Sequence, residues 1–318
     1  MPVIIGHRGA PGYRPEHTRS SYELAIEQGA DAVEPDVVAT RDGVLVVRHE
    51  NEISGTTDVA DRPEFAHLRT VKEFAGHTVE GWFTEDFTWA ELQTLRSRER
   101  IPDLRPDSAA FDGAERILSL PDVLDVARAG GVGVVIEIKH APYFASIGID
   151  LAELVARDVR AAGWQGEGAP GALIVESFEE QALRGVRERG IDARYVYLVE
   201  RKGTAVDLLL ERGSEAPSYS DQLADIPALA DRVDGISVHK HLLVAKDEPP
   251  AFAGRALEAG LDLFTWTCRP ENAFLEKRFR LPGGSAARGD WRAEWALLAQ
   301  IGVTGVFADH PDLAREAF

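Results

Sequence analysis

The sequence predicts an α/β fold, a TIM (β/α)8 barrel with a small insertion after its second strand. Short apolar runs alternate with segments whose apolar residues recur at spacings of three and four, which indicates parallel strands joined by helices. These segments form eight strand–helix repeats, and eight is the number that closes a barrel. The 318 residues match a typical barrel of roughly 250 residues plus an insertion. We therefore expect a single domain over residues 1–318.

Each element can be assigned from these two patterns. The strand candidates are residues 3–5, 32–39, 44–47, 132–138, 172–176, 194–199, 235–238, 261–267 and 305–308. The helix candidates are residues 20–28, 120–129, 151–162, 179–189 and 291–300. We interpret 44–47 as a β-extension of the second unit, which leaves eight repeats. The alternative, an open doubly wound sheet, would normally carry a glycine-rich dinucleotide loop, and HRGAPG lacks its spacing and acidic partner.

One stretch breaks the alternation of strands and helices. From about residue 51 to 117 the chain is polar, aromatic and punctuated by prolines. It follows directly on His49, at the end of an apolar run. We interpret it as an inserted subdomain that lies beside the site.

Composition narrows the class of partner. Hydrophobic residues make up 44% of the chain, enough for a large core. The formal net charge is −18 with no basic block, which argues against nucleic acid or an anionic membrane surface as partner. A small anionic substrate stays compatible, because a metal ion and a few cations can reverse the field locally. The sequence does not indicate an oligomeric state.

The start of the chain and its single cysteine bear on compartment. Cys268 is the only cysteine, so no internal disulfide can form. The start MPVIIGHRG does not read as a signal peptide, and no apolar run approaches the roughly 18 residues of a membrane span. We expect a cytoplasmic protein without stable membrane insertion. A periplasmic or secreted location would follow if a leader had been removed.

Three acidic residues near strand ends predict a metal site. Glu34 and Asp36 lie two apart in a strand and project from one face, and Pro35 between them indicates a strand end or bulge. Two carboxylates this close repel unless a cation intervenes, and a hard divalent ion accepts oxygen ligands. Glu137, in the apolar run GVGVVIEIK, is the natural third ligand. The alternative is a structural ion pair between Glu137 and Lys139.

Two histidines complete the predicted chemistry. His7 and His49 both end apolar runs, beside cationic or acidic residues. Cleaving a phosphodiester requires one group that takes a proton from the nucleophile and one that protonates the leaving oxygen, and imidazoles suit both roles. Arg8 offers planar donors to a phosphate, and Lys139 offers a point charge. We therefore predict metal-assisted chemistry on a phosphate.

Other residues near strand ends are weaker candidates. Trp266 ends the strand LDLFTWT, where it walls a small organic group or fills the barrel interior. His17 contacts substrate, orients its loop or begins the following helix, with Thr18 as its cap. Asp309 and His310 are expected to cap the last helix. His239, Lys240 and His241 follow the strand 235–238, where they could reach substrate, and we expect them in an exposed loop.

The ordered motifs resemble those of the glycerophosphodiester phosphodiesterases. The matching segments are HRGAPGYRPEHT, EPDVVATRDGVLVVRHE, EIK, TWT and GVTGVFADHPD, and together they span the chain. The segment TTDVADR and the variant PEHT are similar to the bacterial periplasmic-type branch. One departure is Glu50, where the family usually has aspartate.

The resemblance implies a TIM barrel that hydrolyses glycerophosphodiesters, such as glycerophosphocholine or glycerophosphoethanolamine, to sn-glycerol 3-phosphate and an alcohol. It implies attack by the substrate's own neighbouring hydroxyl, through a cyclic phosphate. The implied roles are acid–base catalysis for His7 and His49, one calcium or magnesium ion held by Glu34, Asp36 and Glu137, phosphate contacts for Arg8 and Lys139, and a glycerol wall for Trp266.

Two alternatives remain at this point. A lysophospholipase D-like enzyme acting on lysophospholipids would need an apolar groove, which Phe83, Phe87 and Trp89 of the insertion could supply. A non-catalytic barrel that binds polyol phosphates would not need both His7 and His49, so the presence of both counts against it.

Overall fold

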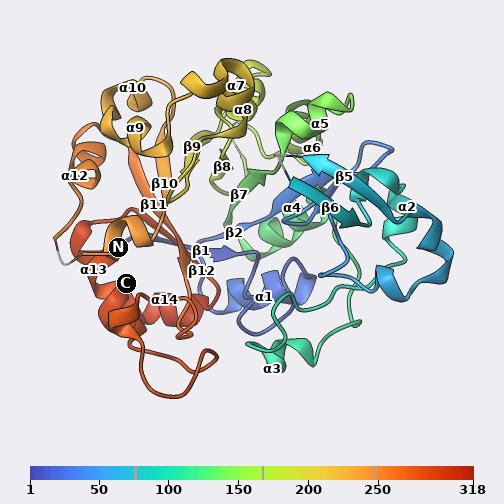
Figure 1. The fold of residues 1–318 in the computed structure, drawn as a ribbon, viewed down its shortest axis with the longest axis horizontal. Helices are drawn as coiled ribbons and strands as arrows, with labels where there is room; N and C mark the ends of the chain where they lie inside the picture. Colours follow the sequence, from blue (N-terminus) through green and yellow to red (C-terminus); the bar gives the residue numbers. More distant parts are fainter. Residues whose placement is uncertain (75–76, 167, 247) are drawn as a thin grey trace.

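The computed structural model describes residues 1–74, 77–166, 168–246 and 248–318, and it confirms the predicted barrel. Parallel strands lie at the centre of the molecule and helices surround them (Figure 1). The strands that form the barrel are β1 (Val3–His7), β2 (Ala32–Glu34), β3 (Asp36–Ala39), β7 (Gly133–Ile138), β8 (Leu173–Ser177), β9 (Arg194–Val199), β10 (Gly235–His239), β11 (Asp262–Cys268) and β12 (Gly305–Ala308).

The barrel closes between its first and last strands. β1 pairs with β12 in parallel, and every further neighbour around the ring is also parallel. Pro35 interrupts the second strand, so β2 and β3 together occupy one position in the ring, since proline cannot donate to the ladder. β4 (Leu45–Val47) pairs antiparallel with β3, as expected for an extension of this unit.

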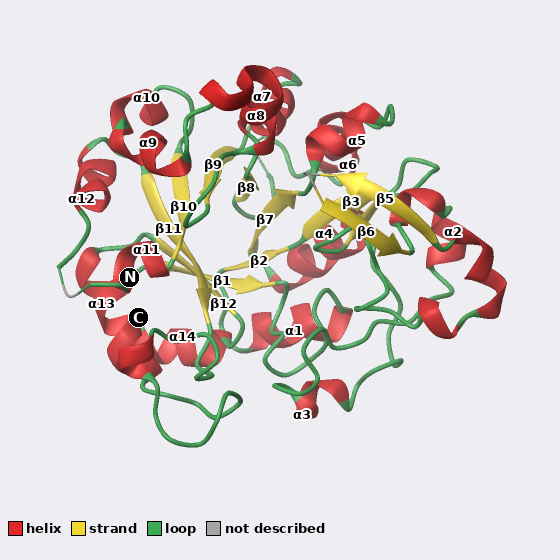
Figure 2. Cartoon of the chain, in the orientation of Figure 1, coloured by secondary structure: helices red, strands yellow, loops and turns green. Residues whose placement is uncertain are grey.

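Helices pack around the outside of the ring (Figure 2). They are α1 (Arg19–Glu27), α4 (Leu120–Gly130), α5 (Ala141–Ser146), α6 (Leu151–Ala161), α7 (Glu180–Glu188), α8 (Val206–Arg212), α9 (Tyr219–Ala224), α10 (Ile226–Ala230), α11 (His241–Val244), α12 (Ala251–Glu258), α13 (Trp291–Ile301) and α14 (Pro311–Ala317). The sequence sets their ends. Thr18 caps α1 by accepting from the backbone N–H of Ser21, and Ser119 and Asp122 form a capping box on α4.

The inside of the barrel is filled by one apolar layer. Its members are Ile5, Ala32, Val135, Ile174, Val196, Phe264 and Phe307, all nearly inaccessible to solvent. They come from seven of the barrel's strand positions. The residue two positions further along a strand points to the same side. The next interior layer, toward the carboxyl ends of the strands, is therefore formed by the residues two positions after each of these members.

Residues between β4 and α4 form short elements beside the barrel (Figure 1). These are β5 (Thr70–Phe74), β6 (His77–Gly81), α2 (Trp89–Leu92), α3 (Pro106–Ala109) and the 3-10 turns Val59–Asp61, Pro63–Leu68 and Thr84–Asp86. Phe83 and Phe87 are fully buried, and Trp89 packs against the main core. These aromatic side chains thus hold the segment together and onto the barrel, and the groove expected for the lysophospholipid alternative does not form from them.

Among the residues that the structure describes, no helix combines the length and apolar character needed to cross a membrane.

Candidate active site

A cavity of about 510 Å³ opens at the carboxyl ends of the barrel strands. Active sites of TIM barrels lie at this end. Residues that line the cavity include His7, Arg8, His49, Glu137, Lys139 and Trp266. The two remaining predicted site residues, Glu34 and Asp36, are buried at neighbouring strand ends. The structure therefore brings the sequence-predicted residues to one end of the barrel, with both histidines on one cavity.

Strand register explains this convergence. His7, Glu34, Glu137 and Glu176 each stand two residues after a member of the apolar layer. In the sheet, His7 is paired with Glu34, and Glu137 is paired with both Asp36 and Glu176. The carboxylates are thus the next interior layer of the barrel.

The acidic cluster differs in membership from the set inferred from sequence. Carboxylate oxygens of Glu34, Glu137 and Glu176 all lie within 4.8 Å of one another, which makes them a possible metal site. Asp36 is not part of this group. Sequence reasoning missed Glu176, although it ends the apolar run LIVES as Glu137 ends its own.

Too few positively charged groups lie near these carboxyl groups to balance their negative charges. Burial, with the charges of Asp36 and Glu137, raises the pKa of Glu34 well above its usual value, and burial beside Glu137 does the same for Glu176. Burial raises the pKa of Glu137 to about 8, although Lys139 opposes the shift. One oxygen each of Glu34, Asp36 and Glu176 is buried without a hydrogen-bond partner. The residues therefore fit a divalent cation, which would both neutralise and ligate them.

Asp36 has polar partners of its own. One of its oxygens lies 2.9 Å from Nε2 of His17 and 3.2 Å from Nε of Arg8. His17 is fully buried and its Nδ1 contacts the hydroxyl of Tyr22 at 2.7 Å, so it does not face the cavity. His17 therefore orients Asp36, which settles the choice left open by the sequence in favour of a positioning role.

Arg8 adopts a backbone conformation that serves the cluster. Its φ of 58° lies in the left-handed region, which is uncommon for a residue with a side chain. In this turn its backbone N–H donates to a carboxylate oxygen of Glu34 at 2.7 Å. Its guanidinium also pairs with Glu16 at 3.0 Å. The strand end is thus fixed from both the backbone and the side chain.

His7 is oriented by a buried carboxylate. Its Nδ1 lies 2.6 Å from one oxygen of Asp309, and the other oxygen accepts from Arg105 at 2.6 Å and Arg269 at 2.7 Å. Since the carboxylate only accepts, Nδ1 carries the proton and Nε2 is left with its lone pair. Burial and the charge of Arg8 lower the pKa of His7 to about 4, so this imidazole is neutral near pH 7.

The expected capping role of Asp309 and His310 is wrong. Neither side chain caps α14, because Asp309 is turned to His7 and no capping hydrogen bond forms at His310. The ring of His310 instead occupies the space where a Cβ at Gly12 would stand. At Gly9, whose φ is +94°, a Cβ would meet Ser21. A side chain at either position would collide with these neighbours, so glycine leaves the room that His310 and Ser21 occupy.

His49 is oriented by its chain neighbour. Its Nδ1 lies 2.5 Å from Glu50, and the other carboxylate oxygen of Glu50 lies 2.7 Å from Arg100 of the insertion. Nζ of Lys139 lies 3.1 Å from Nε2 of His49. Burial, with the charges of Arg8 and Lys139, lowers the pKa of His49 to about 3. Glu50, which stands where the family usually has aspartate, thus contacts the imidazole directly.

Lys139 links the acidic cluster to His49. Its Nζ contacts Glu137 at 2.6 Å and lies 3.7 Å from Asp36. Burial alone lowers the pKa of Lys139, but Glu137 and Asp36 outweigh it and keep the ammonium charged. The ion pair considered as an alternative at the sequence level does form, and it lies within the cavity wall.

Part of the cavity wall is aromatic. The ring of Trp266 packs edge-on against the rings of Phe178 and His239, with distances of 5.7 Å and 4.8 Å between the ring centroids. Trp266 also packs against the apolar layer of the barrel, so it both covers the interior and faces the cavity. Lys240, expected in an exposed loop, is instead buried in an ion pair with Glu294.

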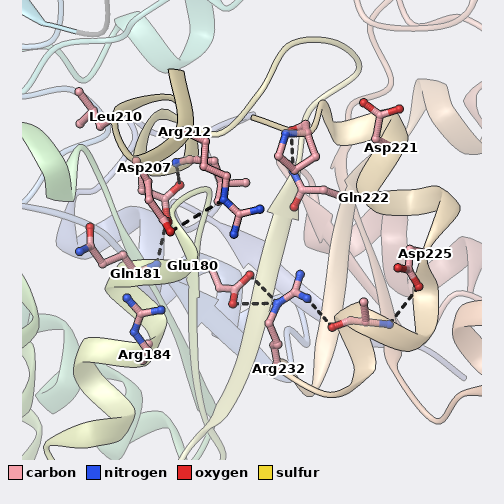
Figure 3. Close-up of a pocket in the computed structure, with 14 residues that line it drawn as sticks. Glu180, Gln181, Arg184, Asp207, Leu210, Arg212, Asp221, Gln222, Asp225 and Arg232 are labelled. Carbon is pink, nitrogen blue, oxygen red and sulfur yellow. Dashed lines mark hydrogen bonds and ion pairs between the residues drawn. The ribbon is translucent and has the colours of Figure 1, made fainter. Parts of the chain in front are cut away.

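A second depression, of about 690 Å³, lies among helices α7 to α10 and is shown in Figure 3. Its charged side chains pair locally: Arg232 contacts Glu180 at 2.9 Å, and Asp207 accepts from the backbone N–H of Gln181 at 3.0 Å. It contains none of the histidines or strand-end carboxylates described above. We therefore assign the chemistry to the smaller cavity.

Comparisons with known proteins agree with the motifs. The model of the glycerophosphoryl diester phosphodiesterase family matches residues 7–313. Glycerophosphodiester phosphodiesterase GDPD6 of Arabidopsis thaliana is 28% identical over 327 residues, which cover 97% of this chain and 83% of the relative. The glycerophosphodiester phosphodiesterase of Haemophilus influenzae is 27% identical over 339 residues, which cover 99% of this chain and 89% of that protein.

Solved structures share the fold. An Oleispira antarctica phosphodiesterase, solved in complex with the product sn-glycerol-3-phosphate, has a TM-score of 0.64 and 19% identity, and the match covers 100% of this chain and 96% of that one. The finer assignment to a periplasmic-type branch stays a prediction. Since the family match extends over nearly the whole chain, this protein belongs to the glycerophosphoryl diester phosphodiesterase family and is an enzyme of that class.

Proposed function

We propose that this protein hydrolyses small glycerophosphodiesters, with glycerophosphocholine and glycerophosphoethanolamine as substrates, to sn-glycerol 3-phosphate and the free alcohol. One observation carries the proposal: two imidazoles, each oriented by a carboxylate, line a cavity that also holds Arg8, Lys139 and an acidic cluster. The product complex of the Oleispira antarctica relative supports the substrate class.

His7 and His49 are the proposed acid–base pair. One imidazole takes the proton from the attacking hydroxyl through Nε2 as the new P–O bond forms. The other gives a proton to the head-group oxygen as the old P–O bond breaks. Both rings hold Nδ1–H toward a carboxylate, which stabilises the imidazolium that each role requires. The negative charge of a bound phosphodiester would raise the low pKa values of the free site.

Arg8 and Lys139 are the proposed phosphate contacts. Both are buried and charged at the cavity, where solvent screens them little. Glu34, Asp36 and Glu137 are the proposed ligands of one divalent cation, calcium or magnesium. When bound, such an ion supplies charge stabilisation to the phosphoryl oxygens. Trp266 would wall the glycerol moiety.

The nucleophile need not come from the protein. Cys268 is buried, burial raises the pKa of its thiol to about 12, and it does not line the cavity. Attack by the hydroxyl next to the phosphoester, through a cyclic phosphate that water then opens, requires only the acid–base pair and electrostatic stabilisation.

Separate replacement of the histidines tests the proposal. With calcium or magnesium added, His7→Ala and His49→Ala should each lower kcat/KM for glycerophosphocholine about 10²–10⁴-fold. A glycerophosphodiester with a 4-nitrophenol leaving group needs no protonation, so it should restore the variant that lacks the acid but not the one that lacks the base.

His241→Ala is the matched control, because this histidine pairs with Glu276 and does not line the cavity. It should retain the wild-type rate. Full activity in either His7→Ala or His49→Ala would show the acid–base assignment to be wrong.

A further inference from the structure

Glu176 stands in the acidic layer of the barrel without an assigned role. It is at the end of β8, where it is paired in register with Glu137 and only 1% exposed. The two-residue step that leads from Val135 to Glu137 on β7 leads from Ile174 to Glu176 on β8. The backbone therefore aims both carboxylates into the same space.

The carboxylate of Glu176 lacks the partners that its neighbours have. Glu137 is paired with Lys139, and Asp36 with Arg8 and His17. Glu176 forms no ion pair within the described part of the chain, and one of its oxygens is buried with no hydrogen-bond partner. A buried carboxylate left in this state costs free energy, and a bound ion is one of the few features of a native protein that offset such a cost.

The spacing of the cluster matches a single ion. Two oxygens that bind one calcium at 2.3–2.6 Å lie at most about 5 Å apart. Oxygens of Glu34, Glu137 and Glu176 all fall within 4.8 Å of one another. Glu34 also retains one buried oxygen without a partner. One cation can therefore contact all three residues.

We propose that Glu176 is a further ligand of the divalent cation, in addition to the three residues inferred from sequence. The inference rests on the metal dependence in the proposed function. It assigns a fourth carboxylate to the site, so that β8 also contributes a metal ligand. Phe178, two residues after Glu176, belongs to the aromatic part of the cavity wall.

The competing role for Glu176 is a direct contact with substrate. A protonated Glu176 could donate a hydrogen bond to a glycerol hydroxyl. The two roles separate cleanly, because a ligand changes the affinity for the metal alone, whereas a substrate contact changes KM at saturating metal.

Calorimetric titration of the metal-stripped protein with Ca²⁺, and separately with Mg²⁺, distinguishes them. Glu176→Gln should weaken the affinity for the ion at least about 10–100-fold, the range seen when even outer partners of metal ligands are lost. Glu176→Asp keeps the charge on a shorter side chain, so its affinity should fall between those of the wild type and Glu176→Gln.

Glu179→Gln is the matched control. Glu179 is three residues away, lines the same cavity and is bonded to Ser177, but lies outside the cluster. Its metal affinity should equal that of the wild type. Thermal melting gives a second readout: Glu176→Gln should melt no lower than the wild type without metal, and should gain less from adding Ca²⁺.

Unchanged metal affinity in Glu176→Gln, with KM raised at saturating Ca²⁺, would overturn the inference in favour of a substrate contact. Absence of Ca²⁺ and Mg²⁺ binding in the wild type would also overturn it. Failure of the proposed function has a different signature, namely that the wild type binds the ion normally yet does not cleave glycerophosphocholine.

Discussion

The two histidines are held by the same type of contact, but in regions of very different burial. At β1, His7 is oriented by Asp309 from the far end of the chain, and Asp309 is fully buried between Arg105 and Arg269. After β4, His49 is oriented by the adjacent Glu50, whose side chain is 34% exposed and paired with Arg100. We refer to these groups as the His7 arm and the His49 arm.

The comparison shows what the insertion contributes. Arg105 and Arg100 both come from the segment between β4 and α4, and each pairs with the carboxylate that orients one histidine. The barrel supplies the imidazoles, and the insertion fixes their partners. Because buried ion pairs respond to loss of one partner far more than exposed ones do, the two arms should differ in how much stability depends on them.

The largest effect is expected from Asp309→Asn. It removes the carboxylate that pairs with Arg269 and one of the two carboxylates that pair with Arg105, which should lower the free energy of unfolding by about 3–5 kcal/mol. It also removes the group that fixes the His7 tautomer, so kcat should fall about 10²–10⁴-fold. Chemical denaturation and steady-state kinetics measure the two losses.

Asp312→Asn provides the control on the same segment, because Asp312 accepts from the hydroxyl of Tyr13 and does not contact His7. If Asp309→Asn kept the stability and the kcat of the wild type, the proposed difference between the two arms would be wrong.

A smaller effect is expected from Glu50→Gln. The carboxylate is partly solvated, so its loss should change the free energy of unfolding by less than about 1 kcal/mol. The rate should still fall about 10-fold to 100-fold, because the His49 imidazolium loses its negative partner. Glu50→Asp, which keeps the charge, should lie closer to the wild type. A stability loss as large as that of Asp309→Asn would show that burial does not separate the arms.

The smallest effect concerns pH, and here the arms should behave alike. Burial lowers the pKa of both histidines, to about 4 for His7 and about 3 for His49, from an unfolded value near 6.5. At these two side chains the unfolded chain therefore binds more protons below pH 6.5, so the two histidines should contribute a loss of stability to the metal-free protein as pH falls from 6.5 toward 4.

Replacing either His7 or His49 with Gln should remove about one of the protons that are taken up on unfolding, and it should reduce the slope of the unfolding free energy against pH accordingly. The measurement is the unfolding free energy as a function of pH. If the slope between pH 6.5 and 4 does not change in either variant, the histidines do not fold in their neutral form.

Much of the fold follows from local pattern. Residues 194–199 and 305–308 are strands as predicted, because continuous apolar runs mark strands buried on both faces. His7, Glu34 and Glu137 could be found because a polar residue ending such a run is conspicuous. The break at Pro35 was foreseeable for the same local reason, the missing N–H of proline.

Contacts between distant segments could not be predicted in this way. Asp309 was expected to cap a helix because ADHP resembles a helix start, and only barrel closure between β12 and β1 brings it to His7. Arg100 and Arg105 lie in a segment without periodicity, so nothing in the sequence connects them to Glu50 or Asp309. Glu176 was missed because its importance depends on strand register, which the order of residues alone does not give.

The most direct test is a crystal structure with Ca²⁺ and sn-glycerol 3-phosphate. The account predicts one ion bound to oxygens of Glu34 and Glu137 at about 2.3–2.6 Å, with the phosphate within hydrogen-bond distance of Nε2 of both His7 and His49. An ion bound away from these carboxylates, or a phosphate that approaches neither imidazole, would contradict it.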